Sequence, residues 1–406
     1  MREQSKNLLM LFFIVISILT HLNISAQVTI GSNEPPVEGA LLQLKELSGA
    51  GGGINSLRGL GLPRISLSML NDLDDVVGTS KPEGYKEAHI GLVIFNVPNT
   101  AICPIFEEGV YVWNGQKWNP LIDPYREIKK FIDKRDGVTY KYRRFGKAGD
   151  WMIENLRATR YDDNEGGGSL IESRNNTSTT TVIKYYYYPS ATAYNNINSD
   201  KEYFDKNKEL GVGLLYTYYA AANGSKYTDT INYINSSTRL RSQHATISSR
   251  LQGICPDGWY LPSDADWADL EEVIASDSKS EYSFWNSNIV WKPEYSDIAG
   301  WRVNGLGSLM KSCFMPEPKQ KTGGLSKQNG FNVMLLGFID QSIMTEYSQT
   351  GSFYTSTMST NQALNSNRNP IPGNAVWMRF FGNSKNQVYR DIMSTANMYS
   401  VRCRRN

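Results

Sequence analysis

The chain has 406 residues, with 42 basic and 40 acidic side chains and a formal net charge of +2 at pH 7. This balance gives no electrostatic footprint for nucleic acid or an anionic membrane, so we expect neither as a partner. The length suggests two or three domains and is ample for a large core. The 24 tyrosines, 9 tryptophans and only 3 histidines favour a turn-rich, β-containing extracellular protein over a cytosolic helical enzyme.

Residues 1–26 have the layout of a secretory signal peptide. Arg2 and Lys6 precede an apolar run from Leu8 to Leu19, and Ala26 stands at the expected cleavage point. The alternative, a membrane anchor, is disfavoured because the run has about 12 residues and spanning a bilayer takes about 20. We therefore expect an exported chain without a transmembrane segment in its mature form, located in the periplasm, on the outer-membrane surface or outside the cell.

Residues 27–120 are predicted to form a small β-rich module. Val28 to Gly31 and Ala40 to Leu44 have strand character, and Asn114-Gly115 is typical of a hairpin turn. The order "V-x-I-G … L-x-L … G-x-L-P-R … Y-x-W-N-G-x-x-W" resembles the N-terminal stalk modules of secreted Bacteroidetes surface proteins and phage tail-fibre-like proteins. The resemblance implies a stalk or assembly module. Residues 121–134, which are rich in charged side chains, are predicted to form a linker after it.

The densest constraints in the chain lie between Cys255 and Trp267, within a second domain predicted over residues 135–406. A turn after the cysteine is followed by a short strand, a helix N-cap and the first apolar residue of an amphipathic helix. We interpret this stretch as a core-building unit rather than a ligand site. Its structural motif consists of Gly258, Trp259, Leu261, Pro262, Ser263 and Trp267.

A candidate ligand surface combines aromatic and acidic residues, as extracellular sugar sites often do. The candidates are Tyr186, Tyr188, Asp162, Asp163 and Trp377. Each has a simpler interpretation, because the tyrosines suit a half-buried strand, the aspartates a solvated turn and Trp377 a core position. We expect no cofactor. Calcium suits oxygen-rich extracellular sites, but no motif specific to it is present.

Nothing in the pattern of nucleophiles and bases suggests an enzyme. The three histidines, His21, His89 and His244, lie far apart in sequence and form no triad or zinc-ligand spacing. We therefore predict a protein that is not an enzyme and holds no metal.

Residues 136–406 resemble the Fibrobacter succinogenes major paralogous domain of secreted Bacteroidetes and Fibrobacteres proteins. Three of the matching pieces are Trp151 to Tyr161 ("W-M-x-E-N-L-x-x-T-x-Y"), Cys255 to Trp267 ("C-P-x-G-W-x-L-P-S-x-x-x-W") and Ser400 to Cys403 ("S-V-R-C"). The chain departs from the family at Leu335 to Asp340, where a Gly-Gly-Tyr-Arg-like segment is usual. Any role of that tyrosine and arginine is therefore not carried over.

The same motifs resemble C-type-lectin-like folds, including the branch shared with formylglycine-generating enzymes. The fold class implied is α+β: a C-type-lectin-like C-terminal domain of twisted antiparallel strands with one or two helices, preceded by the β-rich module. Within the Bacteroidetes resemblance, Asp229-Thr230-Ile231 also fits the short acceptor sequence for O-glycosylation, at Thr230.

Four cysteines in an exported chain allow three disulfide pairings, and the sequence alone does not choose among them. The family resemblance favours Cys255 with Cys403, a loop closure of about 4–5 kcal/mol in the chain-entropy model. We expect Cys103 and Cys313 to be free, with pairing between them as the alternative. Cys313 and Cys403 do not match the catalytic cysteines of formylglycine-generating enzymes.

These observations favour a secreted, surface-associated, non-catalytic protein, with an adhesion or assembly head on a stalk module. Other surface proteins or glycans are the expected partners. Two alternatives remain open: a carbohydrate-binding lectin-like protein, and an orphan enzyme on the formylglycine-generating scaffold.

Overall fold

The computed structural model describes most of the chain from Val28 to Asn406, with gaps. The described residues are 28–37, 40–47, 54–97, 106, 108–121, 128–172, 183–189, 197–224, 226–231, 249–281, 289–292, 299–313, 315, 322, 324, 330–340, 343–359 and 375–406. The predicted signal peptide lies outside them. The chain divides into two units, residues 1–63 and 64–406, and each is described by itself.

The first unit contains a two-stranded parallel ribbon made of β1 (Val28–Ile30) and β2 (Leu42–Leu44). Their register pairs Val28 with Leu42 and Ile30 with Leu44. The turn after β1 requires glycine, because Gly31 has a φ of +105° and an added Cβ would lie 2.6 Å from the carbonyl oxygen of Lys45. Both predicted strands are therefore present, although each is short.

A four-stranded sheet with its own core follows. It consists of β3 (Arg64–Ile65), β4 (Val93–Asn96), β5 (Gly109–Trp113) and β6 (Trp118–Pro120), accompanied by short helices α2 (Asp74–Val77) and α3 (Tyr85–Ala88). Trp113 and Trp118 pair across the β5–β6 hairpin with ring centroids 5.5 Å apart. The Asn114 side chain accepts hydrogen bonds from the backbone of Gln116 and Lys117, so the predicted Asn-Gly turn is confirmed.

The remaining strands form a five-stranded and an eleven-stranded sheet. The five-stranded sheet consists of β7 (Lys129–Ile132), β8 (Thr139–Arg144), β9 (Asp150–Met152), β14 (Trp259–Tyr260) and β22 (Arg404–Arg405). The eleven-stranded sheet consists of β10 (Ile171–Glu172), β11 (Tyr185–Tyr187), β12 (Leu215–Thr217), β13 (Asp229–Ile231), β15 (Gly300–Arg302), β16 (Phe338–Asp340), β17 (Ile343–Thr345), β18 (Thr350–Ser359), β19 (Ala375–Gly382), β20 (Val388–Ser394) and β21 (Met398–Ser400).

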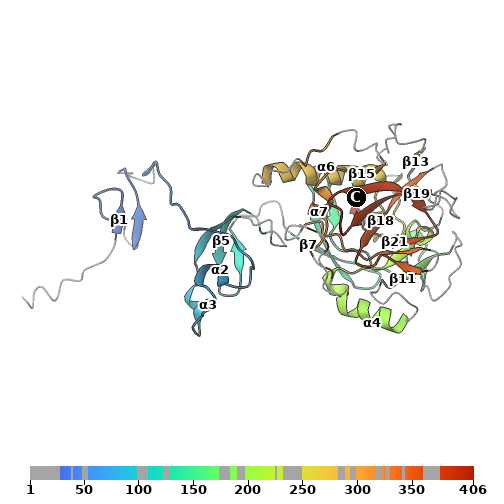
Figure 1. The fold of residues 1–406 in the computed structure, drawn as a ribbon, viewed down its shortest axis with the longest axis horizontal. Coiled ribbons are helices and arrows are strands. Elements are labelled where there is room, and N and C mark those ends of the chain that lie inside the picture. The colour runs from blue at the N-terminus through green and yellow to red at the C-terminus, as the bar shows by residue number, and fades with distance from the viewer. Residues whose placement is uncertain are drawn as a thin grey trace, which may run out of the picture. The chain divides into compact units, whose positions relative to one another are not determined.

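Helices border these sheets rather than forming a layer of their own. In Figure 1, α4 (Ile197–Asn207) and α6 (Asp264–Glu281) lie at opposite margins of the strand-rich body. The other helical segments are single turns: α5 (Tyr218–Ala221), α7 (Leu306–Met310) and the 3-10 turns Gly146–Ala148, Asp163–Glu165 and Lys208–Leu210.

The expected α+β, C-type-lectin-like fold class is wrong. The described chain is mostly β with several sheets, whereas the prediction of a β-rich N-terminal module fits. The large sheet is also mixed rather than purely antiparallel, because β13 and β21 both run parallel to β18. The expectation of one or two helices on antiparallel strands did not include the long pairing of β18, β19 and β20, which no single motif marks.

The part of the chain that carries the five- and eleven-stranded sheets is called the large domain here, and its core is built around the motif stretch from Cys255 to Trp267, which runs into α6. Trp267 is completely buried, and its ring packs against Trp151, Phe331 and Phe353 at centroid distances of 5.3, 5.6 and 5.4 Å. Trp259 stacks on Phe131 at 4.5 Å. The interpretation of this stretch as a core-building unit agrees with these contacts.

The last strands connect the two sheets. The chain passes from β21 in the eleven-stranded sheet to β22 in the five-stranded sheet, and Cys403 lies between them. Cys403 is bonded to Cys255 as the family resemblance implies. Cys313 is disulfide-bonded too, so the expectation of a free thiol there is wrong. Cys103, and with it the alternative pairing, lies outside the described residues.

Candidate functional site

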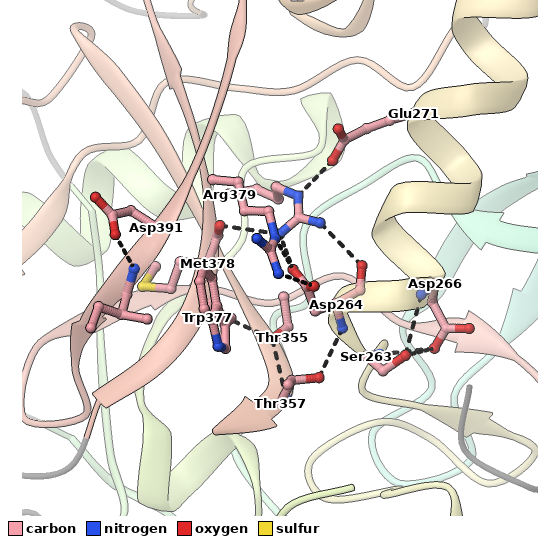
Figure 2. Close-up of polar contacts among 12 residues, drawn as sticks. Ser263, Asp264, Asp266, Glu271, Thr355, Thr357, Trp377, Met378, Arg379 and Asp391 are labelled. Carbon is pink, nitrogen blue, oxygen red and sulfur yellow. Dashed lines mark hydrogen bonds and ion pairs between the residues drawn. The ribbon is translucent and has the colours of Figure 1, made fainter. Parts of the chain in front are cut away.

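The N-terminus of α6 is closed by a capping box. The Ser263 hydroxyl accepts a hydrogen bond from the backbone N–H of Asp266 (3.2 Å), and the Asp266 carboxylate accepts one from the backbone N–H of Ser263 (2.8 Å). The backbone N–H of Asp264 donates to the Thr357 hydroxyl on β18 (3.0 Å), as Figure 2 shows. The N-cap predicted at Ser263 is therefore present, and it fixes the start of the helix against the large sheet.

Asp264, held at this fixed helix start, meets two arginines from adjacent strands. Its carboxylate accepts hydrogen bonds from Nε and Nη2 of Arg390 on β20, at 2.9 and 2.7 Å. It also accepts one from Nη1 of Arg379 on β19, at 2.6 Å. One carboxylate thus joins the helix to two strands through charge-assisted bonds.

Glu271 repeats this arrangement two helical turns later, on the same face of α6. Its two oxygens accept from Nη2 of Arg302 on β15, at 2.8 and 2.7 Å. Nε of Arg379 donates to it as well, at 2.5 Å, so Arg379 bridges both carboxylates. Figure 2 shows the Arg379 side chain extending toward Glu271 and Asp264. We call Asp264, Glu271, Arg302, Arg379 and Arg390 the buried ion cluster.

The cluster is buried away from water, so its charges interact strongly with one another. Each of its five residues is at most 1% exposed. Burial alone would raise the pKa of Asp264, but the charges of Arg390 and Arg379 outweigh burial and hold that pKa well below its usual range. The guanidinium of Arg390 also lies 3.9 Å from the ring centroid of Trp377, which covers it from one side.

A second buried arginine connects two of the family motifs. Arg402, in "S-V-R-C", donates from Nε to the side-chain oxygen of Asn155 (2.8 Å), in "W-M-x-E-N-L". The Asn155 amide in turn donates to the Ser400 hydroxyl (3.2 Å). The other nitrogens of Arg402 reach the carbonyl oxygens of Phe331 and Asn332. These motif residues are thus positioned to hold the closing strand.

Both arginine sites join segments that are far apart in the sequence and so hold the fold together. Their guanidinium groups contact carboxylates, main-chain carbonyls or the side-chain amide of Asn155, and they are buried. In the part of the chain that the structure covers, no group of three or more His, Cys, Asp or Glu side chains is placed to hold a metal ion. Among the same residues no helix is long and apolar enough to cross a membrane.

The acidic residues of the predicted ligand surface lie on a turn. Asp163 has a side chain that is 93% exposed and lies 3.3 Å from Arg160. Asp162 accepts a hydrogen bond from the backbone N–H of Asp257 (3.0 Å), which ties this turn to the turn after Cys255. The solvated-turn interpretation thus describes Asp163, while Asp162 has a structural contact.

The three aromatic candidates are buried. Tyr186 and Tyr188 are each 8% exposed and meet edge to face at 5.7 Å, and the Tyr186 hydroxyl donates to Glu172 (3.3 Å). Trp377 is 1% exposed. The structure therefore does not assemble the predicted exposed platform, because these rings serve the core. Thr230 belongs to β13, but its side chain lies outside the described residues.

A partly exposed aromatic pair, of which Trp301 is the exposed member, occurs elsewhere, at residues that the sequence did not single out. Trp301 on β15 is 40% exposed and lies opposite Tyr389 on β20, with ring centroids 4.9 Å apart. The Tyr389 hydroxyl donates to Asp391 (2.7 Å), and the ammonium group of Lys385 lies 5.6 Å from the Trp301 ring. The sequence alternates Trp301 with Arg302, which could have indicated a strand with one exposed aromatic residue. The pairing of β15 with β20, which places Tyr389 beside Trp301, cannot be inferred from the sequence.

The fold and its buried arginine sites define a predominantly β domain whose helix and closing strand are locked by internal ion pairs and a disulfide. Residues 147–405 match the Fibrobacter succinogenes major domain, and residues 29–134 match the phage tail like trimerisation region. Since the first match covers more than half of the chain, the protein belongs to the Fibrobacter succinogenes major domain family. No curated protein and no solved structure matches the chain.

Replacing Asp264 with asparagine should lower the free energy of unfolding by about 3–5 kcal/mol, because two buried guanidinium groups lose their shared counter-charge. Urea unfolding at pH 7 measures this. The matched control is Glu272→Gln on the same helix, whose partly exposed carboxylate pairs with Lys147 and should change stability by about 1 kcal/mol or less. Equal effects of the two substitutions would contradict the importance assigned to the cluster.

Stability should also fall in acid. The pKa of Asp264 is depressed in the folded state, so its contribution is present above the unfolded-state pKa of about 4 and is lost as the pH drops toward the lower folded-state value. We expect the urea midpoint of the wild type to decrease below about pH 4 more steeply than that of Asp264→Asn. Parallel curves for the two proteins would show that Asp264 does not supply this dependence.

Proposed function

We propose that this chain is a non-catalytic surface protein whose N-terminal residues hold several copies together and whose C-terminal domain is the head presented to partners. The match of residues 29–134 to a trimerisation region carries the proposal. The head supports it, because the buried charges that could have marked an active site are paired with one another. Its partners would be other surface proteins or glycans.

Export is part of the proposal. The sequence begins with the pattern of a signal peptide, and a disulfide ties the motif before α6 to the closing strand. Structural disulfides persist in oxidising compartments such as the periplasm and the cell exterior. Two independent features thus support a location beyond the cytoplasm.

The assembly is tested by mass. We expect the purified full-length protein to sediment at three times the mass of one chain, and a chain beginning at Ile128 to sediment as a monomer. Analytical ultracentrifugation at several protein concentrations measures both. A monomeric full-length protein would rule out the proposed assembly, and a trimeric truncated chain would place the contacts in the C-terminal domain instead.

A second candidate function is carbohydrate binding, and the Trp301–Tyr389 pair favours it. Sugars stack on exposed aromatic rings and donate hydrogen bonds to neighbouring carboxylates, and Asp391 supplies such a group beside Tyr389. If this function is correct, a glycan array should show binding that Trp301→Ala abolishes and Trp377→Phe, in the core, retains. An array without signal for the wild type, with and without a calcium chelator, would eliminate it.

A further inference from the structure

The parallel ribbon of β1 and β2 exposes an apolar face. Val28, Ile30, Leu42 and Leu44 are 48%, 56%, 56% and 37% exposed. Because side chains alternate along a strand and the register pairs Val28 with Leu42 and Ile30 with Leu44, all four lie on one side of the ribbon. We call these four residues the ribbon face.

The opposite, polar side of the ribbon is the one that the chain itself covers. Gln43 accepts a hydrogen bond from the backbone N–H of Val37 (2.8 Å), and Lys45 donates to the carbonyl oxygen of Pro35 (3.1 Å). Lys45 is also paired with Glu34 at 2.9 Å, and only 9% of it is exposed. The connection between the strands thus packs over the polar side, while the aliphatic side stays open.

A unit that is stable alone in water covers its apolar side and exposes its polar side, whereas this ribbon covers its polar side and exposes its apolar side. Parallel strands are normally covered on both faces, and two strands alone are too few for independent stability. Residues 28–60 also contain ten of the twenty large hydrophobic side chains that are exposed in the described parts of the chain. Such a concentration marks an interaction surface.

The family match and the charges of this region indicate what covers the surface. Three of the four residues of the ribbon face lie at the start of the region that matches a trimerisation family, and Val28 immediately precedes that region, which favours the same face of other copies as the partner. A lipid surface would call for excess positive charge, whereas residues 28–60 contain three glutamates against one lysine and one arginine. Lys45 and Arg58 are themselves paired with Glu34 and Glu46.

We propose that Val28, Ile30, Leu42 and Leu44 form the contact through which three copies of this chain associate, with the ribbon faces packed against one another around a threefold axis. Cyclic symmetry presents an equivalent face from each copy, so the aliphatic side chains leave water together. The inference rests on the proposed assembly function and adds to it the particular surface and partner.

The test is the sedimentation mass of the full-length variant Ile30→Asp/Leu42→Asp. We expect a single-chain mass for it, and a trimer mass both for the wild type and for the control Ile132→Asp/Ile343→Asp, which alters two exposed aliphatic residues outside the ribbon. A trimeric ribbon-face variant would overturn this inference and leave the proposed assembly intact. A monomeric wild type would instead remove the proposed assembly and, with it, this inference.

Cross-linking provides a second measurement that does not require the double aspartate variant to fold. Under mild oxidation, Leu42→Cys should form covalently linked copies on non-reducing gels, whereas Gln43→Cys, on the covered side, should not. Equal linkage at both positions would contradict the assigned face. Flotation of the wild type with vesicles of phosphatidylcholine and phosphatidylglycerol would contradict the assigned partner, because we expect the protein to stay in the aqueous fraction.

Discussion

The bridge that Arg379 makes between Asp264 and Glu271 is the interaction on which the large domain depends. It fastens two positions of α6, two helical turns apart, to β19, and Arg390 and Arg302 extend the attachment to β20 and β15. The cost of burying five charged groups is offset only while every partner is in place. Such a cluster therefore specifies one position of the helix on the sheet and penalises any displacement.

The family motifs meet at the closing strand of the domain. "W-M-x-E-N-L" supplies Asn155, which contacts Ser400 and Arg402 of "S-V-R-C", and "C-P-x-G-W" supplies Cys255, which is bonded to Cys403. Three segments far apart in the sequence thus meet at the closing strand. Loops and edges around such a framework are the places where folds usually carry function.

Features with local causes could be predicted from the sequence. Ser263 and Asp266 lie three residues apart and cap the helix themselves, and Asn114-Gly115 sets its own turn. The disulfide partner came from the family resemblance. The ion cluster could not be predicted, because Arg379 is 108 and 115 residues from the carboxylates it joins. The pairing of Trp301 with Tyr389 could not be predicted for the same reason, because paired strands are far apart in the sequence. The fold class was predicted wrongly because local sequence does not indicate which strands pair.

The closing strand contacts residues that are far away in the sequence, and this affects the rate of folding. Its contacts with Asn155 span 245 and 247 residues, and the disulfide spans 148. Folding rates fall as the sequence separation of native contacts grows, and domains dominated by such pairings fold in roughly milliseconds to seconds rather than microseconds. The domain thus passes through a comparatively long period with unpaired strand edges, during which oxidation of Cys255 with Cys403 would shorten the remaining search by holding the closing strand beside its partners.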